Sequence, residues 1–328
     1  MKHSNKYLLA FLVSLLTLGG ASLASAQEHI YPVTIMDVSP RATAMGGLTL
    51  GEATSDYLYT NPAAFVRGEQ WVYASVSGAV GSKLLESGRP YSISSSVGVT
   101  KWGVGLMAGI RYKAGIKIPK YDPNGVEIPG KFIHQMDRAI DFGVAYNPIK
   151  SLPLGFYAKY AYYLTAYGRN AVAHSFTAGA SYQHRFMTSD GVYNHLLTGT
   201  VEVSELGRNF SDGKTTVLHL PSNVAGALSW NYVGIAGSKF DTTLGVQGRY
   251  FFKPEKRSLM QFSVGGEVMY NKLLSLQVGY QYAWRDLSFL GCGLGVKLPN
   301  FNIHFGSHIS LAKDMPRHNF IGGVSFEL

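Results

Sequence analysis

The sequence predicts an all-β protein: a transmembrane antiparallel β-barrel of about fourteen strands with an N-terminal plug segment. First, many runs of residues alternate between apolar side chains and small or polar ones, with the period of two that a β-strand requires. Second, no stretch after the N-terminal leader has the roughly 18 uninterrupted apolar residues of a membrane helix. Third, charged residues make up only 15% of the chain, aromatic residues 13%, and glycine 38 of 328 residues. Soluble domains carry about 25% charged residues and about 7% glycine, so this composition favours a barrel in a membrane.

Residues 1–26 have the features of a cleaved signal peptide. A basic start comes before the apolar run Leu8–Leu18, which is too short to span a bilayer. Ala24-Ser25-Ala26 then matches an A-x-A cleavage site, which favours removal over retention as a signal anchor. We therefore expect export to the outer membrane and a mature chain that begins at Gln27.

The basic charge of the chain does not indicate nucleic acid. The formal charge is +9, and two of these charges, Lys2 and Lys6, belong to the leader. The basic residues are scattered singly or in pairs, without the clusters of a nucleic-acid surface. Loops that face anionic lipopolysaccharide, or a basic lumen, explain the excess better. The single Cys292 excludes an intrachain disulfide.

The segment 274–285 illustrates the strand pattern. One face carries Leu274, Leu276, Val278, Tyr280, Tyr282 and Trp284, and the other carries Ser275, Gln277, Gly279, Gln281, Ala283 and Arg285. A helix would have no coherent apolar face here. Similar runs, each close to the 9–11 residues of a tilted transmembrane strand, are 71–79, 91–100, 102–113, 138–146, 154–166, 172–184, 196–206, 222–232, 240–252, 260–272, 274–285, 288–298, 301–311 and 319–328.

The connections between these runs differ in length. They are short around 100–101, 147–148, 271–272 and 299–300, and long at 114–137 and 207–221. Short turns on one side and long loops on the other are typical of outer-membrane barrels. A secreted β-sandwich or propeller is the soluble alternative. It would expose a face rich in Lys, Glu, Asp and Thr, whereas the second face here is Gly, Ser, Gln and isolated Arg, which suits a lumen.

Residues 27–70 do not follow the strand pattern, and we expect them to form a unit separate from the barrel of 71–328. Their sequence resembles the FadL superfamily of outer-membrane transporters, specifically its PorV/PorQ-like branch from Bacteroidetes. The matching residues are Ser39, Arg41, Ala42, Ala44, Met45, Gly46, Gly47, Asp56, Asn61, Pro62 and Ala63. The resemblance implies a fourteen-stranded barrel, a hatch folded into its lumen, and an apolar ligand bound between the two.

The size of the barrel agrees with a hatch. A barrel of about eight strands is filled by its own side chains, so fourteen strands leave a lumen that needs an insert. The Ala- and Gly-rich run 42–50 would pack closely in a confined space. We expect Asn61-Pro62-Ala63 to form a fixed turn where the plug meets the first strand.

Inward-facing polar residues form a predicted lumen track. Its members are Arg111, Gln247, Arg249, Gln261, Glu267, Gln277, Gln281 and Arg285. Such a track is either a hydrogen-bonded ladder that braces lumen and plug or part of a ligand site, and the residues alone leave both interpretations open.

No catalytic or metal site is predicted, and no cofactor. His174-Ser175 and His308 with Ser310 are the nearest Ser/His pairs, but neither lies in a nucleophile motif, and neighbouring strand residues face opposite ways. His304 and His308 share a strand face about 13 Å apart, too far to bind one ion together.

The leading hypothesis is a non-enzymatic barrel that binds hydrophobic small molecules and transfers them passively through a plugged lumen. The alternative is a PorV/PorQ-like accessory barrel of type IX protein secretion, with secretion-system proteins as partners. An enzyme at the barrel wall is the third hypothesis. Outer-membrane lipid is an expected partner under each of them.

Overall fold

The computed structural model describes most of the chain after residue 35. The described ranges are 36–51, 55–83, 88–122, 126–149, 153–166, 170–187, 193–213, 216–233, 239–253, 259–283, 288–311 and 318–328. The predicted signal peptide, the predicted mature start at Gln27 and the predicted lumen residue Arg285 lie outside these ranges. Within them, no helix is both long and apolar enough to cross a membrane.

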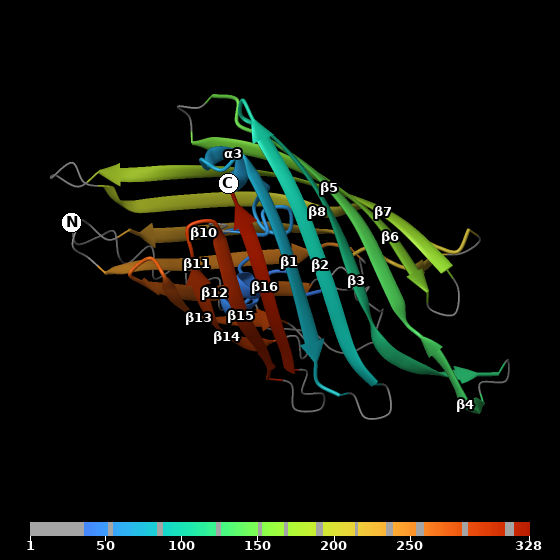
Figure 1. Cartoon of the computed structure of the whole chain (residues 1–328). Coiled ribbons are helices and arrows are strands. Elements are labelled where there is room, and N and C mark those ends of the chain that lie inside the picture. Colours follow the sequence, from blue (N-terminus) through green and yellow to red (C-terminus); the bar gives the residue numbers. More distant parts are fainter. Residues whose placement is uncertain are drawn as a thin grey trace, which may run out of the picture.

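The described residues form a closed antiparallel barrel of fourteen strands (Figure 1). β8 pairs with β10 and so closes the sheet, while β16 pairs with β1. The barrel strands are β1 (Val72–Gly81), β2 (Gly88–Lys101), β3 (Val104–Tyr121), β5 (Met136–Tyr146), β6 (Leu154–Ala166), β7 (Asn170–Met187), β8 (Tyr193–Ser211), β10 (Asn223–Tyr232), β11 (Phe240–Phe251), β12 (Leu259–Tyr270), β13 (Leu274–Ala283), β14 (Phe289–Lys297), β15 (Phe301–Ser310) and β16 (His318–Glu327). Each of the fourteen runs expected from the sequence overlaps one of them, so the predicted fold class is confirmed.

The two faces of the sheet differ in polarity as the alternation predicts. On β13, Leu276 is 62% exposed on the outer face, while Gln277 is 1% exposed on the inner face. Cys292 on β14 also points outward, beside Leu290 and Leu294. The apolar side chains thus cover the outside and the polar ones line the inside, which is the arrangement of a barrel surrounded by lipid.

The two ends of the barrel are unequal. One end of the barrel is where β1 begins and where the C-terminus lies, and we call it the turn end. It carries the tight connections 102–103, 271–273 and 298–300. The opposite end, the loop end, carries the connection between β3 and β5. The segment 114–137 was expected to be a loop, and that prediction is wrong: β3 continues to Tyr121 and pairs with β4 (Glu127–His134). Figure 1 shows β4 projecting away from the barrel.

The other predicted long loop, 207–221, is also partly strand. β8 continues to Ser211, and β9 (Thr216–Leu218) pairs with its end. Both errors have one cause. Outside the apolar band a strand no longer needs alternating side chains, so backbone pairing continues where the sequence pattern stops.

Candidate functional site in the barrel interior

The described part of residues 36–70 packs against the inward faces of the barrel strands. It contains two short helices, α2 (Pro40–Ala44) and α3 (Pro62–Arg67). α2 contacts β13, β14, β15 and β16, while α3 contacts β2, β3, β5, β6 and β7. The two helices therefore contact different sectors of the inner wall. We call residues 36–51 and 55–70 the inserted segment.

Local sequence explains α2. The Ser39 side chain accepts a hydrogen bond from the Ala42 backbone N–H at 3.4 Å, and Pro40 occupies the first helical position. Gly46 and Gly47 follow with φ of 73° and 80°, a left-handed conformation that ends a helix and favours glycine. The Gly47 N–H donates to the Ala42 carbonyl at 2.8 Å. The motif residues Ser39 to Gly47 thus build a capped turn of helix.

Glycines on the inner wall form the surface on which α2 lies. A Cβ atom at Gly265 or Gly279 would overlap the Met45 backbone, and one at Gly291 would overlap the backbone at Thr43 and Ala44. Backbone can approach backbone this closely only where the wall has no side chain. The high glycine content of the chain is therefore used partly to seat the inserted segment.

A buried ion pair joins α2 to this surface. The Nη2 and Nε atoms of Arg41 lie 2.6 and 2.9 Å from Oε2 of Glu267 on β12. The Gln277 side chain donates to the other oxygen of Glu267 at 2.7 Å and to Ser275 at 2.6 Å. Since a buried charge needs both a partner and hydrogen bonds, this network fixes the position of Arg41.

Gln247 on β11 satisfies the backbone that follows α2. Its Oε1 accepts hydrogen bonds from the N–H groups of Thr49 and Leu50, both at 3.0 Å, and its Nε2 donates to the Gly47 carbonyl at 3.4 Å. Arg249 donates to the Thr49 hydroxyl at 3.4 Å. Buried backbone groups outside regular structure need such partners, and the lumen side chains supply them.

Asp56 connects the two halves of the inserted segment. It is buried, has φ of 52°, and its carbonyl accepts hydrogen bonds from Tyr59 and Thr60. Burial raises the pKa of its carboxyl, and a hydrogen bond from Ser75 on β1 and one from Ser39 offset only part of this effect. Ser39 and Asp56, which are separated in the motif, therefore meet inside the barrel.

Asn61 ties the second half of the segment to the wall. Its amide donates to the Gly51 carbonyl, to Ser181 on β7 and to Thr200 on β8, each at 3.2 Å. The predicted turn at Asn61-Pro62-Ala63 is wrong, because Pro62 begins α3. Proline favours the first position of a helix, where its missing N–H costs no hydrogen bond.

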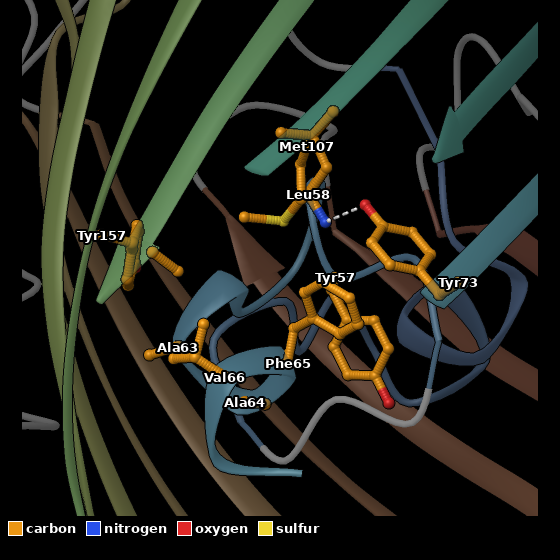
Figure 2. Packing of buried hydrophobic residues seen from close by; sticks show 10 residues of the cluster. Tyr57, Leu58, Ala63, Ala64, Phe65, Val66, Tyr73, Met107 and Tyr157 are labelled. Carbon is orange, nitrogen blue, oxygen red and sulfur yellow. Dashed lines mark hydrogen bonds between the residues drawn. The ribbon is translucent and has the colours of Figure 1, made fainter. Parts of the chain in front are cut away.

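α3 packs through an apolar cluster, shown in Figure 2. Tyr57, Phe65 and Tyr73 lie with their ring centroids 4.9 to 5.2 Å apart. The Tyr73 hydroxyl accepts a hydrogen bond from the Leu58 N–H at 3.2 Å. Met107 on β3 and Tyr157 on β6 complete the cluster from the wall. Burial of apolar surface therefore adds to the Asn61 hydrogen bonds in holding the second half of the segment.

Asp37 makes a third connection between the inserted segment and the wall, with residues of β15 and β16 that lie near the loop end. Its Oδ2 lies 3.3 Å from His308 Nδ1 on β15 and 3.1 Å from the Asn319 amide on β16. Burial alone would raise the pKa of Asp37. The hydrogen bond and charge of His308, together with the Asn319 bond, outweigh burial and lower it.

A second polar cluster lies across the lumen and was not expected as a group. Arg111 on β3 forms a bidentate pair with Asp141 on β5, at 2.9 and 2.7 Å. The Tyr163 hydroxyl lies 3.2 Å from Arg111 and donates to Glu205 at 2.7 Å. Glu205 has φ of 57° where the β7–β8 register shifts, which marks a β-bulge. Asp141 could have been found from its inward place in the run 138–146, but nothing in the sequence signals the bulge.

An apolar cluster borders the Arg111 cluster. Phe210, at 5.7 Å from the Tyr163 ring, and Leu220 pack against inward alanines. The alanines are Ala139, Ala161, Ala171 and Ala173. These side chains are buried and form a second apolar group in the barrel interior, which we call the inner apolar cluster.

The polar residues of the predicted lumen track thus belong to two separate groups in the structure. Glu267, Gln277, Gln247 and Arg249 lie on the wall of the first half of the inserted segment, as does Gln281, which is beside Gly47. Arg111 instead belongs to the cluster with Asp141. The side chains of His174 and Ser175 face opposite ways. The described residues contain no group of three or more metal-ligating side chains.

Comparisons with known proteins bear on the fold. No protein-family model matches the sequence, and no curated protein matches it significantly. The structure is similar to that of the Ralstonia pickettii toluene transporter TbuX, with 14% identity, 88% of this chain and 98% of that chain covered, and a TM-score of 0.58.

Two further solved structures are similar. The Pseudomonas putida toluene transporter TodX has 13% identity, 87% and 96% coverage and a TM-score of 0.54. The CymD monoaromatic hydrocarbon channel has 11% identity, 88% and 97% coverage and a TM-score of 0.56. This chain therefore shares the fold of these hydrocarbon channels along most of its length.

Proposed function

We propose that the chain spans the outer membrane and transfers hydrophobic small molecules passively through its lumen, with the inserted segment as the plug. The observation that supports the proposal is the combination of a fold shared with a toluene transporter and an inserted segment whose helices contact the inner wall. A fourteen-stranded barrel without an insert would be an open pore. The inserted segment would exclude ions and sugars and leave a route that favours apolar molecules.

The inner apolar cluster is the place that we propose for ligand contact. Phe210, Leu220, Tyr163 and four alanines are packed against one another there, so a ligand would enter by displacing these side chains. Molecules of the size of toluene bind chiefly by burying apolar surface in such settings. The substrate class proposed is therefore small and apolar.

Uptake in a Gram-negative host that lacks its own hydrocarbon channel tests this function. Cells that express the chain should accumulate labelled toluene faster than cells with an empty vector, and both should take up labelled glucose equally. Faster uptake of glucose as well would indicate an open pore. Toluene uptake at the empty-vector rate, with the chain folded in the outer membrane, would contradict the proposal.

Conductance in planar bilayers tests the plug separately. Deletion of residues 27–60 removes α2, Asp56 and the contacts of Gln247, and it should convert a closed barrel into a stable open channel. The purified full-length mature chain is the control and should show little conductance. If the shortened chain folds, as judged by heat-modifiable gel mobility, and remains closed, the segment is not the plug.

Type IX secretion remains a second proposal, in line with the resemblance to PorV/PorQ-like proteins. The feature that favours it is the β3–β4 hairpin, which projects beyond the barrel and exposes Phe132 and Val126. A protein partner could bind such a hairpin. Replacing residues 118–133 by a short turn would abolish secretion of cargo under this hypothesis and leave toluene uptake unchanged.

A further inference from the structure

The cross-strand register arranges the outer face of β3, β5, β6, β7 and β8 in rows. The three rows nearest the turn end contain no charged side chain. They are Val104, Tyr146, Phe156, Ala180 and Val201; Leu106, Val144, Ala158, Ala178 and Val203; and Ala108, Phe142, Tyr160, Phe176 and Leu206. This band matches the apolar surface that faces the lipid chains of a membrane.

The next two rows toward the loop end have a different character. Row four is Ile110, Ile140, Tyr162, His174 and Arg208, and row five is Tyr112, Arg138, Leu164, Val172 and Ser211. Aromatic rings and guanidinium groups thus appear together where the purely apolar band ends. Tyrosines at this level are typical of the interface between lipid chains and headgroups.

Arg138 and Arg208 are exposed and lack an acidic partner in the described part of the chain. Arg138 is opposite Tyr112, and its Nη2 contacts only the Met136 sulfur, at 2.9 Å. Arg208 is opposite His174, and the described ion pairs do not include it. Each guanidinium therefore has free donors at the boundary of an apolar band. Guanidinium groups bind phosphate oxygens in a bidentate manner.

We propose that Arg138 and Arg208, with Tyr112 and Tyr162 beside them, form a binding surface for the phosphate groups of a phosphorylated glycolipid in the outer leaflet. The surface lies on the wall, outside the lumen, and does not take part in transfer of hydrophobic molecules. The proposal rests on the proposed outer-membrane location, with the loop end outside the cell. Charge complementarity selects an anionic headgroup, and the apolar rows below it would contact its acyl chains.

The turn end of the same wall also has exposed aromatic side chains, among them Tyr146 and Phe156. The neighbouring strand β2 ends there at Lys101. The Lys101 ammonium lies 4.3 Å from the Trp102 ring centroid, so it already has a cation–π partner. Lys101 is therefore a matched control: an exposed cation at the opposite end of the barrel.

Native mass spectrometry of the purified full-length chain in detergent tests the surface, with diphosphorylated lipid A as the probe. The double variant Arg138→Gln/Arg208→Gln should bind lipid A about tenfold more weakly than the unchanged chain, because two charge-assisted contacts are lost. Lys101→Gln should bind as tightly as the unchanged chain. Glutamine keeps the side chains outward and polar, so the fold should persist, and heat-modifiable mobility checks this.

Two comparisons distinguish binding of the lipid A phosphates from binding of its acyl chains or of free phosphate. Lipid A stripped of its phosphates should bind the unchanged chain and the double variant equally, and inorganic phosphate should not displace intact lipid A. Equal binding of lipid A by the double variant and the unchanged chain would overturn the proposal, as would phosphate-independent binding. A chain that did not fractionate with the outer membrane would instead contradict the proposed location, which separates the two failures.

Discussion

Nη2 of Arg41 lies 2.6 Å from Oε2 of Glu267, although the two residues are 226 positions apart in the chain. Both side chains are buried, at 9% and 4% exposure. The contact joins the first helix of the inserted segment to the barrel wall.

Removing one member of this pair should therefore destabilise the protein strongly. Glu267→Gln leaves the Arg41 charge buried without a counter-charge, which costs about 3 kcal/mol. The double variant Arg41→Met/Glu267→Leu should recover most of the loss, since neither charge remains. Urea unfolding in detergent micelles measures both. An unfolding free energy for Glu267→Gln equal to that of the unchanged protein would mean that the pair does not hold the segment.

Glycine at the α2 surface should not tolerate a side chain. Gly279→Ala places a Cβ against the backbone of Met45 and Gly46, and overpacking of this kind costs about 1–3 kcal/mol. We expect a lower unfolding midpoint and a higher conductance, because the segment is displaced. The control is Gly248→Ala, whose Cβ would meet nothing within 4 Å. Equal effects of the two substitutions would refute close seating of α2.

Cys292 should react from the lipid side of the wall. It is exposed on the outer face between Leu290 and Leu294, so a maleimide that partitions into the membrane should label the folded protein. The control is Ser275→Cys in a Cys292→Ala background, which places the thiol at a buried inward position. Labelling of the inward thiol but not of Cys292 would show that the lipid-facing and lumen-facing sides of the wall are assigned the wrong way round.

Acid should weaken the connection made by Asp37. Its pKa is lowered from the ordinary value of 3.8, so the ionised carboxyl stabilises the fold above that value. This contribution is lost as the pH falls below 3.8 and through the lowered pKa. The unfolding free energy of Asp37→Asn should therefore change less over this window than that of the unchanged protein. Parallel pH profiles for the two proteins would show that the carboxylate contributes nothing.

Asn61 should contribute strongly to the stability of the fold through its hydrogen bonds. Asn61→Ala leaves the Gly51 carbonyl without its donor and removes contacts to Ser181 and Thr200. A buried polar group left unpaired costs about 1–3 kcal/mol. The control is Asn300→Ala, at an exposed turn. We expect only Asn61→Ala to lower the midpoint of urea unfolding.

The sequence by itself determined the barrel, because side-chain alternation reports directly which face of a strand meets lipid. The run 274–285 identified Leu276 as outward and Gln277 as inward, and both are so placed. It also predicted that residues 27–70 form a unit separate from the barrel, since they lack the side-chain alternation of the strands.

Only the tertiary structure decided which wall residues meet that unit. The pairing of Arg41 with Glu267 and of Asp37 with His308 depends on strand register and on the depth of the segment in the barrel. The pairing of Arg111 with Asp141, within the wall, depends on strand register. The local sequence pattern predicts neither the strand register nor the depth of the segment. The same holds for the bulge at Glu205 and for the β3–β4 hairpin, where backbone hydrogen bonds between distant residues, and not side-chain period, set the structure.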